Sequence, residues 1–235
     1  MIRRSLKEST GSDGEKQKDA FLRSGNIFRR KPIRNRLGRE DTQQEMMNRY
    51  RELQLDAKEL LEQRLAESLG LDKYSAIMNS VRTVDVSSDE TFQRQFNAFY
   101  KVRKNAGWRN NFYGLFERAK SETLLYEDVL KELYDSTGFV ESSFTSKMIA
   151  TLDDQCPIID QYVLKNLGLA ITGNGKESRM ESTIQTYYAL CDWYDDYLET
   201  GEARENIAWF DSVLPGYAWI SDVKKIDYLL WAKRD

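Results

Sequence analysis

Residues 138–169 have the sequence GFVESSFTSKMIATLDDQCPIIDQYVLKNLGL, and this stretch decides the fold of the chain. Apolar side chains recur at three- and four-residue steps over residues 144–152, which predicts a helix. A tight polar connection follows over residues 153–157. A second helical pattern runs over residues 158–167 and ends at a glycine. Pro157 suits the first turn of that helix, where no hydrogen bond is lost.

The same helical spacing continues on both sides of this stretch, and no segment alternates as a strand would. Helix N-caps are expected at Ser87, Ser88 or Asp89 and at Ser221 or Asp222. We therefore expect an all-α, multi-helix fold with one helical domain over residues 41–235. The helices are expected at residues 42–70, 72–78, 92–116 with a break at 105–107, 124–134, 181–200, 203–214 and 221–231.

The composition limits which functions are possible. The chain has 235 residues, of which 40% are hydrophobic and 31% charged, enough for one domain with a real core. It contains no apolar run of membrane-spanning length and no signal-peptide pattern, so we expect a cytoplasmic protein without a membrane partner. The chain has no histidine, which excludes imidazole catalysis and His-ligated zinc. Cys156 and Cys191 are expected to be buried free thiols, and no metal is expected.

Charge is distributed unevenly along the chain. Residues 1–39 contain twelve Lys and Arg against four acidic residues, whereas the rest of the chain has a net charge of −11. Residues 1–40 also lack helical or strand periodicity, which predicts a flexible basic arm. Such an arm attracts a phosphate backbone without sequence specificity. A solvated tail or leader segment explains the same composition, and the sequence leaves both interpretations open.

The segment 92–118 is locally basic and rich in aromatic residues. Its aromatic side chains follow helical spacing and are expected in the core, so the basic residues between them are the better candidates for contact with nucleic acid. The candidates are Lys101, Arg103, Lys104 and Arg109.

The order of features in residues 138–169 resembles that of a known family. Gly138 precedes a helix, and Pro157-Ile158-Ile159-Asp160 then leads into a further helix. This arrangement resembles the helix-hairpin-helix DNA glycosylases, with residues 124–169 as the hairpin-containing segment. It is more similar still to uncharacterised bacterial proteins related to the 8-oxoguanine DNA glycosylase branch. The shared patterns are SFxSK, PIxD and a terminal KKID-LLW, here residues 224–231.

The resemblance implies a DNA-binding enzyme that hydrolyses the N-glycosidic bond of a modified or damaged base without a cofactor. Asp160 matches the carboxylate that stabilises positive charge at C1′ or activates water. Ser142, Ser143 and Lys147 are implied as contacts to DNA at the hairpin. Val140 stands near the position of the second hairpin glycine. Ser142 falls near that of the imine-forming lysine, so lyase activity is not implied.

Several alternatives remain open from the sequence. Asp160 is equally suited to cap the helix after it, and Lys147 is equally suited to pair with an acid or to lie on a helix surface. Trp108, Tyr162 and Trp193 are candidates for stacking on a base. The acidity of residues 40–235 favours a second hypothesis, a catalytically inactive helical interaction module such as a phage-defence or mobile-element component.

Overall fold

The computed structural model describes residues 53–64 and 70–233 of the chain. The basic arm expected over residues 1–40, and the first part of the helix expected over residues 42–70, lie outside these residues. The described residues form helices and no strand, which confirms the all-α fold class. The helices are α3 (Ala57–Arg64), α4 (Leu71–Ser80), α5 (Glu90–Tyr100), α6 (Ala106–Arg118), α7 (Tyr126–Thr137), α8 (Ser142–Leu152), α9 (Gln161–Asn166), α10 (Lys176–Leu198), α11 (Gly201–Val213), the 3₁₀ turn η2 (Pro215–Tyr217) and α12 (Asp222–Ala232).

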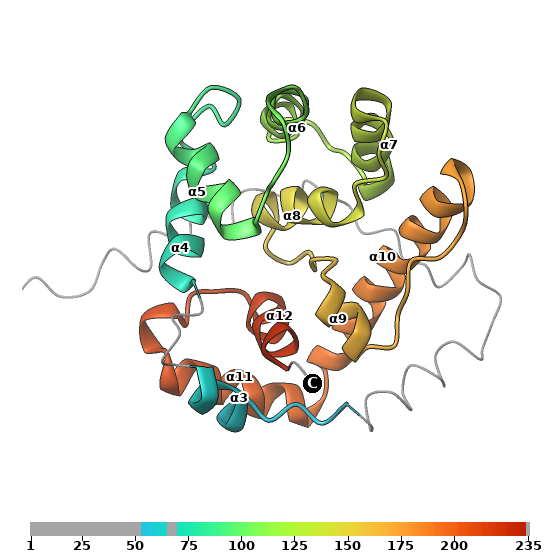
Figure 1. Ribbon diagram of the computed structural model, residues 1–235. Coiled ribbons are helices and arrows are strands. Elements are labelled where there is room, and N and C mark those ends of the chain that lie inside the picture. The colour runs from blue at the N-terminus through green and yellow to red at the C-terminus, as the bar shows by residue number, and fades with distance from the viewer. Residues whose placement is uncertain (1–52, 65–69, 234–235) are drawn as a thin grey trace, which may run out of the picture.

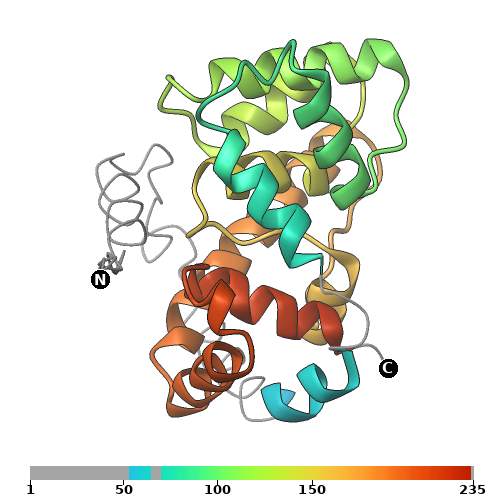
Figure 2. The same cartoon turned by 90° about the vertical axis from the view of Figure 1, so that its left-hand side faces the viewer.

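The helices gather in two groups that α10 connects (Figures 1 and 2). We call α4 to α8 the hairpin lobe, and α3, α9, α11 and α12 the C-terminal lobe. Helix α10 has 23 residues and contacts α7 in the hairpin lobe as well as α11 and α12 in the C-terminal lobe. The connection of residues 153–160 passes from α8 to α9, so it crosses from one lobe to the other.

Aromatic side chains fill the core of the hairpin lobe. Phe92 and Phe96 on α5 pack against Phe112 and Phe116 on α6, with ring centroids 5.5 to 5.8 Å apart. All four side chains are buried. These residues follow helical spacing on each helix, which explains why the aromatic pattern in the sequence belongs to packing.

Short polar side chains set where three helices begin. Asp89 accepts a hydrogen bond from the Phe92 amide at 2.7 Å and caps α5. Ser221 accepts from the Lys224 amide at 3.2 Å and caps α12. Asn105 does the same for α6, so the break between α5 and α6 lies at residues 101–105. The capping predicted from the sequence at α5 and α12 is confirmed.

Several expected helix boundaries are wrong. Helix α10 begins at Lys176 and not at residue 181. The pattern over residues 42–70 is not one helix, because residues 54–56 are not helical and α3 begins only at Ala57. Gln54 has a φ of 32°, and the Asp56 carboxylate accepts from the Glu59 amide at 3.0 Å, which starts a new helix. The second helix of the opening stretch begins at Gln161 and not at Ile158, so Pro157 lies in the connection.

Helices α7 and α8 form the hairpin expected from the sequence. Gly138 ends α7 with a φ of 77°, a conformation that favours glycine, and its amide donates to the Tyr134 carbonyl at 2.7 Å. Residues 139–141 then turn the chain into α8, whose far end leads into the connection to Asp160. The connection runs back along α8, because the Ser143 hydroxyl in the first turn of α8 donates to the Ile159 carbonyl at 2.8 Å, next to Asp160.

Candidate functional site

Asp160 lies at the N-terminus of α9 and caps it. Its Oδ1 accepts a hydrogen bond from the Tyr162 amide at 2.8 Å. The side chain is half-buried, and no second described residue donates a hydrogen bond to this carboxylate. The capping role is therefore present, and it leaves the other carboxylate oxygen available to a ligand.

Lys147 on α8 lies close enough to Asp160 for their charges to interact. Burial lowers the pKa of the Lys147 amine, and the Asp160 carboxylate acts in the opposite direction. The amine lies 5.1 Å from the centre of the Phe144 ring and 5.7 Å from that of Tyr100. Lys147 is thus a half-buried lysine among aromatic rings and beside a carboxylate, which differs from an ordinary surface lysine.

A second pair of charges lies next to these two on α12. The Lys224 amine contacts the Asp227 carboxylate at 2.5 Å, and both residues are buried. Burial acts against the charge of Lys224, yet contact with Asp227 prevails and raises the pKa of Lys224. The hydroxyl of Tyr194 on α10 donates to Asp227 at 3.4 Å. We call Lys147, Asp160, Lys224 and Asp227 the junction cluster, because they lie where the two lobes meet.

Two further polar groups face the junction cluster. The hydroxyls of Tyr74 and Tyr228 are buried and have no hydrogen-bond partner among the described residues. Burial raises the pKa of both phenols, and the charge of Asp227 acts on both in the same direction. The Lys224 amine lies 5.5 Å from the Tyr74 ring and 4.9 Å from the Tyr228 ring. The junction therefore contains hydrogen-bonding capacity that the described protein groups leave unused.

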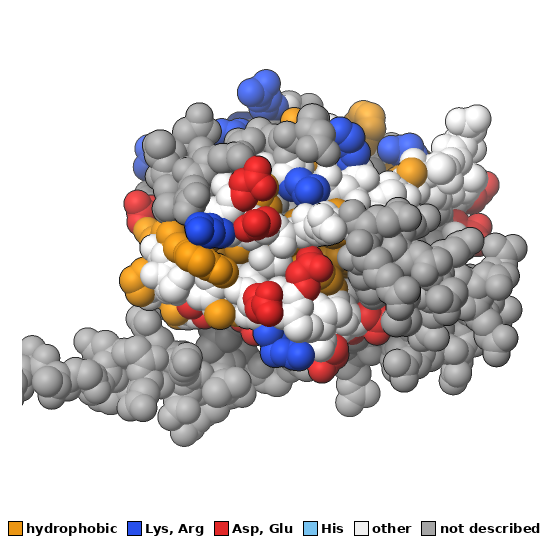
Figure 3. All heavy atoms as spheres, turned by 90° about the horizontal axis from the view of Figure 1, so that it is seen from below, with side chains coloured by type: hydrophobic (Ala, Val, Ile, Leu, Met, Phe, Trp, Pro, Cys, Tyr) orange, Lys and Arg blue, Asp and Glu red, His pale blue; other side chains and the backbone are white. Residues whose placement is uncertain are grey.

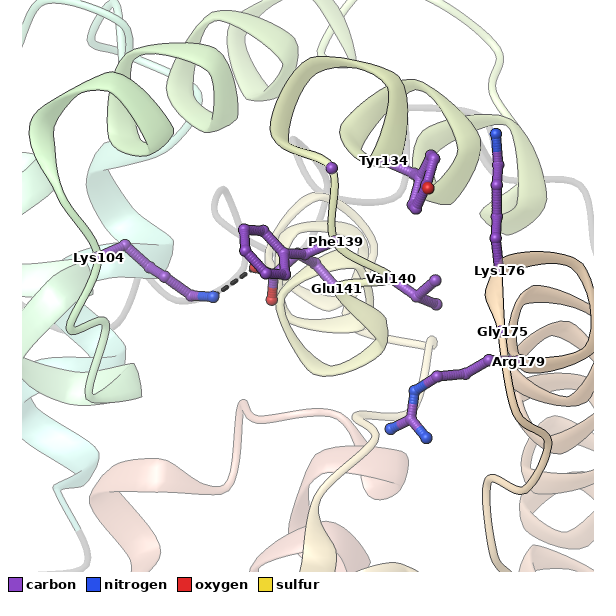
Figure 4. Close-up of a pocket in the computed structure, with 9 residues that line it drawn as sticks. Lys104, Tyr134, Phe139, Val140, Glu141, Gly175, Lys176 and Arg179 are labelled. Atoms are coloured by element: carbon purple, nitrogen blue, oxygen red, sulfur yellow. Dashed lines mark hydrogen bonds and ion pairs between the residues drawn. The ribbon is translucent and has the colours of Figure 1, made fainter.

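A second feature lies at the tip of the hairpin, just before α8 begins (Figure 4). A pocket of about 410 Å³ opens between residues 138–141 and the first turn of α10. Lys176 and Arg179 lie on the α10 side, and Lys104 lies on the other side, where it pairs with Glu141. Three cations and one already paired carboxylate give this pocket a positive charge.

The DNA-contact candidates from the sequence fall in different places. Lys104 lies at the hairpin pocket, and Arg109 donates to the Lys104 carbonyl at 3.0 Å. Lys101 and Arg103 are exposed in the connection between α5 and α6 and do not line the pocket. Lys147 belongs to the junction cluster.

The two serines at the start of α8 make contacts within the fold. The Ser143 hydroxyl donates to the Ile159 carbonyl at 2.8 Å, so it holds the residue that precedes Asp160. The Ser142 carbonyl accepts from the Tyr126 hydroxyl at 3.1 Å. Both side chains are half-buried. Ser143 therefore positions the connection to Asp160.

The three candidates for base stacking differ in exposure. Trp108 is buried, and its indole N–H donates to Glu141 at 3.0 Å. Trp193 is buried and stacks on Tyr197 with ring centroids 4.7 Å apart. Neither ring can stack on a base in this conformation. Tyr162 is half-buried and directly follows the first residue of α9, so it lies near Asp160.

The sequence did not single out Lys224 and Asp227, or Lys176, Arg179 and Phe139, as site residues. The first two are charged residues at i and i+3 in the segment 223–230, whose other residues are apolar or aromatic apart from Lys225, and this pattern is a usable signal for a buried ion pair. No comparable pattern marks the pocket residues, because their proximity depends on how α10 packs beside the hairpin.

Comparison of the chain with protein-family models, curated proteins and solved structures finds no match. Among the described helices, none combines the length and apolar character that a membrane crossing requires. Within the same residues, no three Cys, Asp or Glu side chains are grouped so that they could ligate a metal ion. Cys156 and Cys191 are buried free thiols, as the sequence predicted.

The connection that leads to Asp160 contains a carboxyl that titrates near neutral pH. Burial raises the pKa of Asp154 from 3.8 to about 6. The folded state then binds this proton more tightly than the unfolded state, so the free energy of unfolding falls as the pH rises from about 4 to about 6. Asp154→Asn is expected to be more stable than the wild type at pH 7, by up to about 3 kcal/mol, and equally stable near pH 3.

Urea unfolding at both pH values measures this difference, with Asp153→Asn as the control in the same connection. If the free energy of unfolding of Asp154→Asn depends on pH as that of the wild type does, Asp154 is not the buried carboxyl with a raised pKa.

The buried pair on α12 makes a second prediction. Lys224→Met leaves Asp227 charged and unpaired, and is expected to lower the free energy of unfolding by about 3–5 kcal/mol. The double variant Lys224→Met/Asp227→Leu removes both charges and is expected to recover most of that loss. Urea unfolding of the two single variants and the double variant gives the coupling energy. Additive losses would show that the two side chains do not interact.

Proposed function

We propose that this protein binds DNA and hydrolyses an N-glycosidic bond, with Asp160 as the essential carboxylate. The observation that carries the proposal is the junction cluster, in which a half-buried carboxylate with an available oxygen lies beside a half-buried lysine. Cleavage of this bond builds positive charge at C1′ of the sugar, and a nearby carboxylate stabilises that charge or activates the attacking water.

Three further features support the proposal. The hairpin of α7 and α8 places a positively charged pocket at the start of α8, and Ser143 and Ser146 in the first turns of α8 bind Ile159, the residue before Asp160. Tyr162 is half-buried and lies two residues after Asp160, and it is the aromatic residue proposed to stack on an extruded base. The hydroxyls of Tyr74 and Tyr228 offer unused hydrogen bonds at the junction.

Lys147 has a defined part in this proposal. Its ammonium form compensates the charge of Asp160 before substrate binds, and the same group can contact a phosphate of the bound strand. Hydrolysis forms no covalent bond between this amine and the sugar. Borohydride added during the reaction is therefore expected to trap no protein–DNA adduct. An adduct mapped to Lys147 would show that this amine, and not water, is the nucleophile.

The test is base release from single-stranded and duplex DNA that contain a panel of modified bases. Asp160→Asn is the decisive variant, because asparagine caps a helix about as well as aspartate but carries no charge. We expect it to fold normally and to release base at least about 100-fold more slowly than the wild type.

Asp153→Asn, in the same connection, is the matched control and is expected to keep full activity. Base release that is unchanged in Asp160→Asn would exclude the proposed role. No release from any substrate, together with no salt-sensitive binding to DNA, would remove the function as a whole.

A helical interaction module is the second candidate, and two exposed tryptophans favour it. Trp209 on α11 is 43% exposed and Trp219, after η2, is 41% exposed. Figure 3 shows hydrophobic side chains gathered on one side of this end of the molecule. Exposed apolar surface of this kind is typical of protein contacts. If the protein is such a module, Trp209→Ala and Trp219→Ala are expected to abolish binding to its protein partner, whereas Asp160→Asn is expected to leave that binding unchanged.

A further inference from the structure

The hairpin pocket combines an exposed aromatic ring with cations, which the proposed chemistry at Asp160 does not require. Phe139 at the hairpin tip is 62% exposed, the highest value among the large hydrophobic side chains of the described residues. The Lys104 amine lies 5.4 Å from the centre of this ring. An exposed ring next to a cation costs solvation free energy and is typical of a surface that binds a flat, anionic partner.

The opposite side of the pocket offers two cations. Lys176 and Arg179 lie in the first turn of α10, and both are exposed. The Lys176 amine lies 4.2 Å from the centre of the Tyr134 ring, which directs this side chain along α7. The Arg179 guanidinium forms no hydrogen bond or ion pair with another residue that the structure describes. This arginine is therefore available to an anion that enters the pocket.

The arrangement of the side chains separates a stacking surface from a charged one. In Figure 4, Phe139 lies toward Lys104, whereas Val140 lies toward Lys176 and Arg179. A volume of about 410 Å³ is within the range of pockets that accept small organic molecules. A nucleotide has the same two parts, a flat base and a phosphate, joined by a sugar.

We propose that the hairpin pocket binds an unpaired nucleotide of single-stranded DNA. Phe139 stacks on the base and Arg179 binds the phosphate, while Lys176 adds positive charge at the edge of the pocket. The inference rests on the proposed function only in taking DNA as the ligand. It adds that the strand must be unpaired at this point, because the faces of paired bases are covered by their neighbours in a duplex.

The charge of residues 40–235 agrees with this preference. Residues 40–235 have a net charge of −11, which opposes a broad contact with the dense phosphates of a duplex. A single strand is engaged by local stacking together with few phosphates, and a small positive pocket on an acidic body suits that mode.

The test is fluorescence anisotropy of the full chain with a labelled twelve-nucleotide oligodeoxythymidine and with a duplex of the same length. Phe139→Ala is expected to weaken binding of the single strand about tenfold or more, the size of one base–aromatic stack. Lys176→Gln/Arg179→Gln is expected to weaken it further and to reduce its dependence on salt. The matched controls are Trp209→Ala for an exposed ring and Arg204→Gln for an exposed cation, and both are expected to bind as the wild type does.

A local signal confirms where the strand binds. Phe139→Trp is expected to retain the affinity, and the fluorescence of the introduced tryptophan, taken as the difference from the wild type, is expected to be quenched by the oligonucleotide. Any of four results would overturn the proposal. Phe139→Ala binds the single strand as the wild type does, or the oligonucleotide quenches no fluorescence of the introduced tryptophan. Alternatively, the substitutions lower the affinity for the duplex as much as that for the single strand, or the protein binds oligouridine more tightly than oligodeoxythymidine.

The outcomes also separate this proposal from the proposed function. If base release depends on Asp160 but not on Phe139 with any substrate, the pocket proposal fails and the function stands. If single-strand binding depends on Phe139 while no substrate loses a base, the pocket proposal stands and the function fails.

Discussion

The ion pair between Lys224 and Asp227 is the constraint on which the junction of the two lobes depends. Both side chains are buried, and their charges are stable there only because they contact each other at 2.5 Å and because Tyr194 donates a further hydrogen bond to Asp227. The pair forms within α12, and the Tyr194 hydrogen bond joins it to α10, against which α12 packs. Since α10 also contacts α7, the position of α12 is linked through α10 to the hairpin lobe. Apolar residues would fill the same space with a smaller desolvation penalty. The presence of charged residues here is therefore better explained by the electric field that they create at the junction.

That field acts on two groups that reach the junction from other elements. Lys147 on α8 and Asp160 before α9 are both half-buried, and each feels the charges of Lys224 and Asp227. Asp160 also receives the amide of Tyr162, which fixes one of its oxygens at the start of a helix. Capping and chemistry are therefore compatible at this carboxylate, because each requires a different oxygen. In such a site, fixed charges can act on a developing positive charge without having to rearrange.

The sequence predicted those parts of the fold that depend on local physics. The aromatic spacing of α5 and α6, the caps of α5 and α12 and the hairpin glycine at residue 138 all act within a few residues of each other. Features that depend on distant contacts were not predicted. The helix expected over residues 42–70 is interrupted because Asn206 on α11 binds the Leu55 carbonyl and the Ala57 amide, at 3.0 and 2.9 Å. In the same way, Trp193 is spaced like any helical aromatic, and only the packing of α10 shows that it is buried.

The central claim is that the junction cluster stabilises a positive charge on the sugar of a bound strand. The most direct measurement compares two oligonucleotides in which one nucleotide is replaced, in one by a cationic pyrrolidine and in the other by the neutral tetrahydrofuran of the same shape. This comparison does not require the modified base to be known. The account predicts that the wild type binds the cationic analogue at least about tenfold more tightly and that Asp160→Asn loses this preference. Equal affinity of the wild type for the two analogues, or a preference that survives in Asp160→Asn, would contradict it.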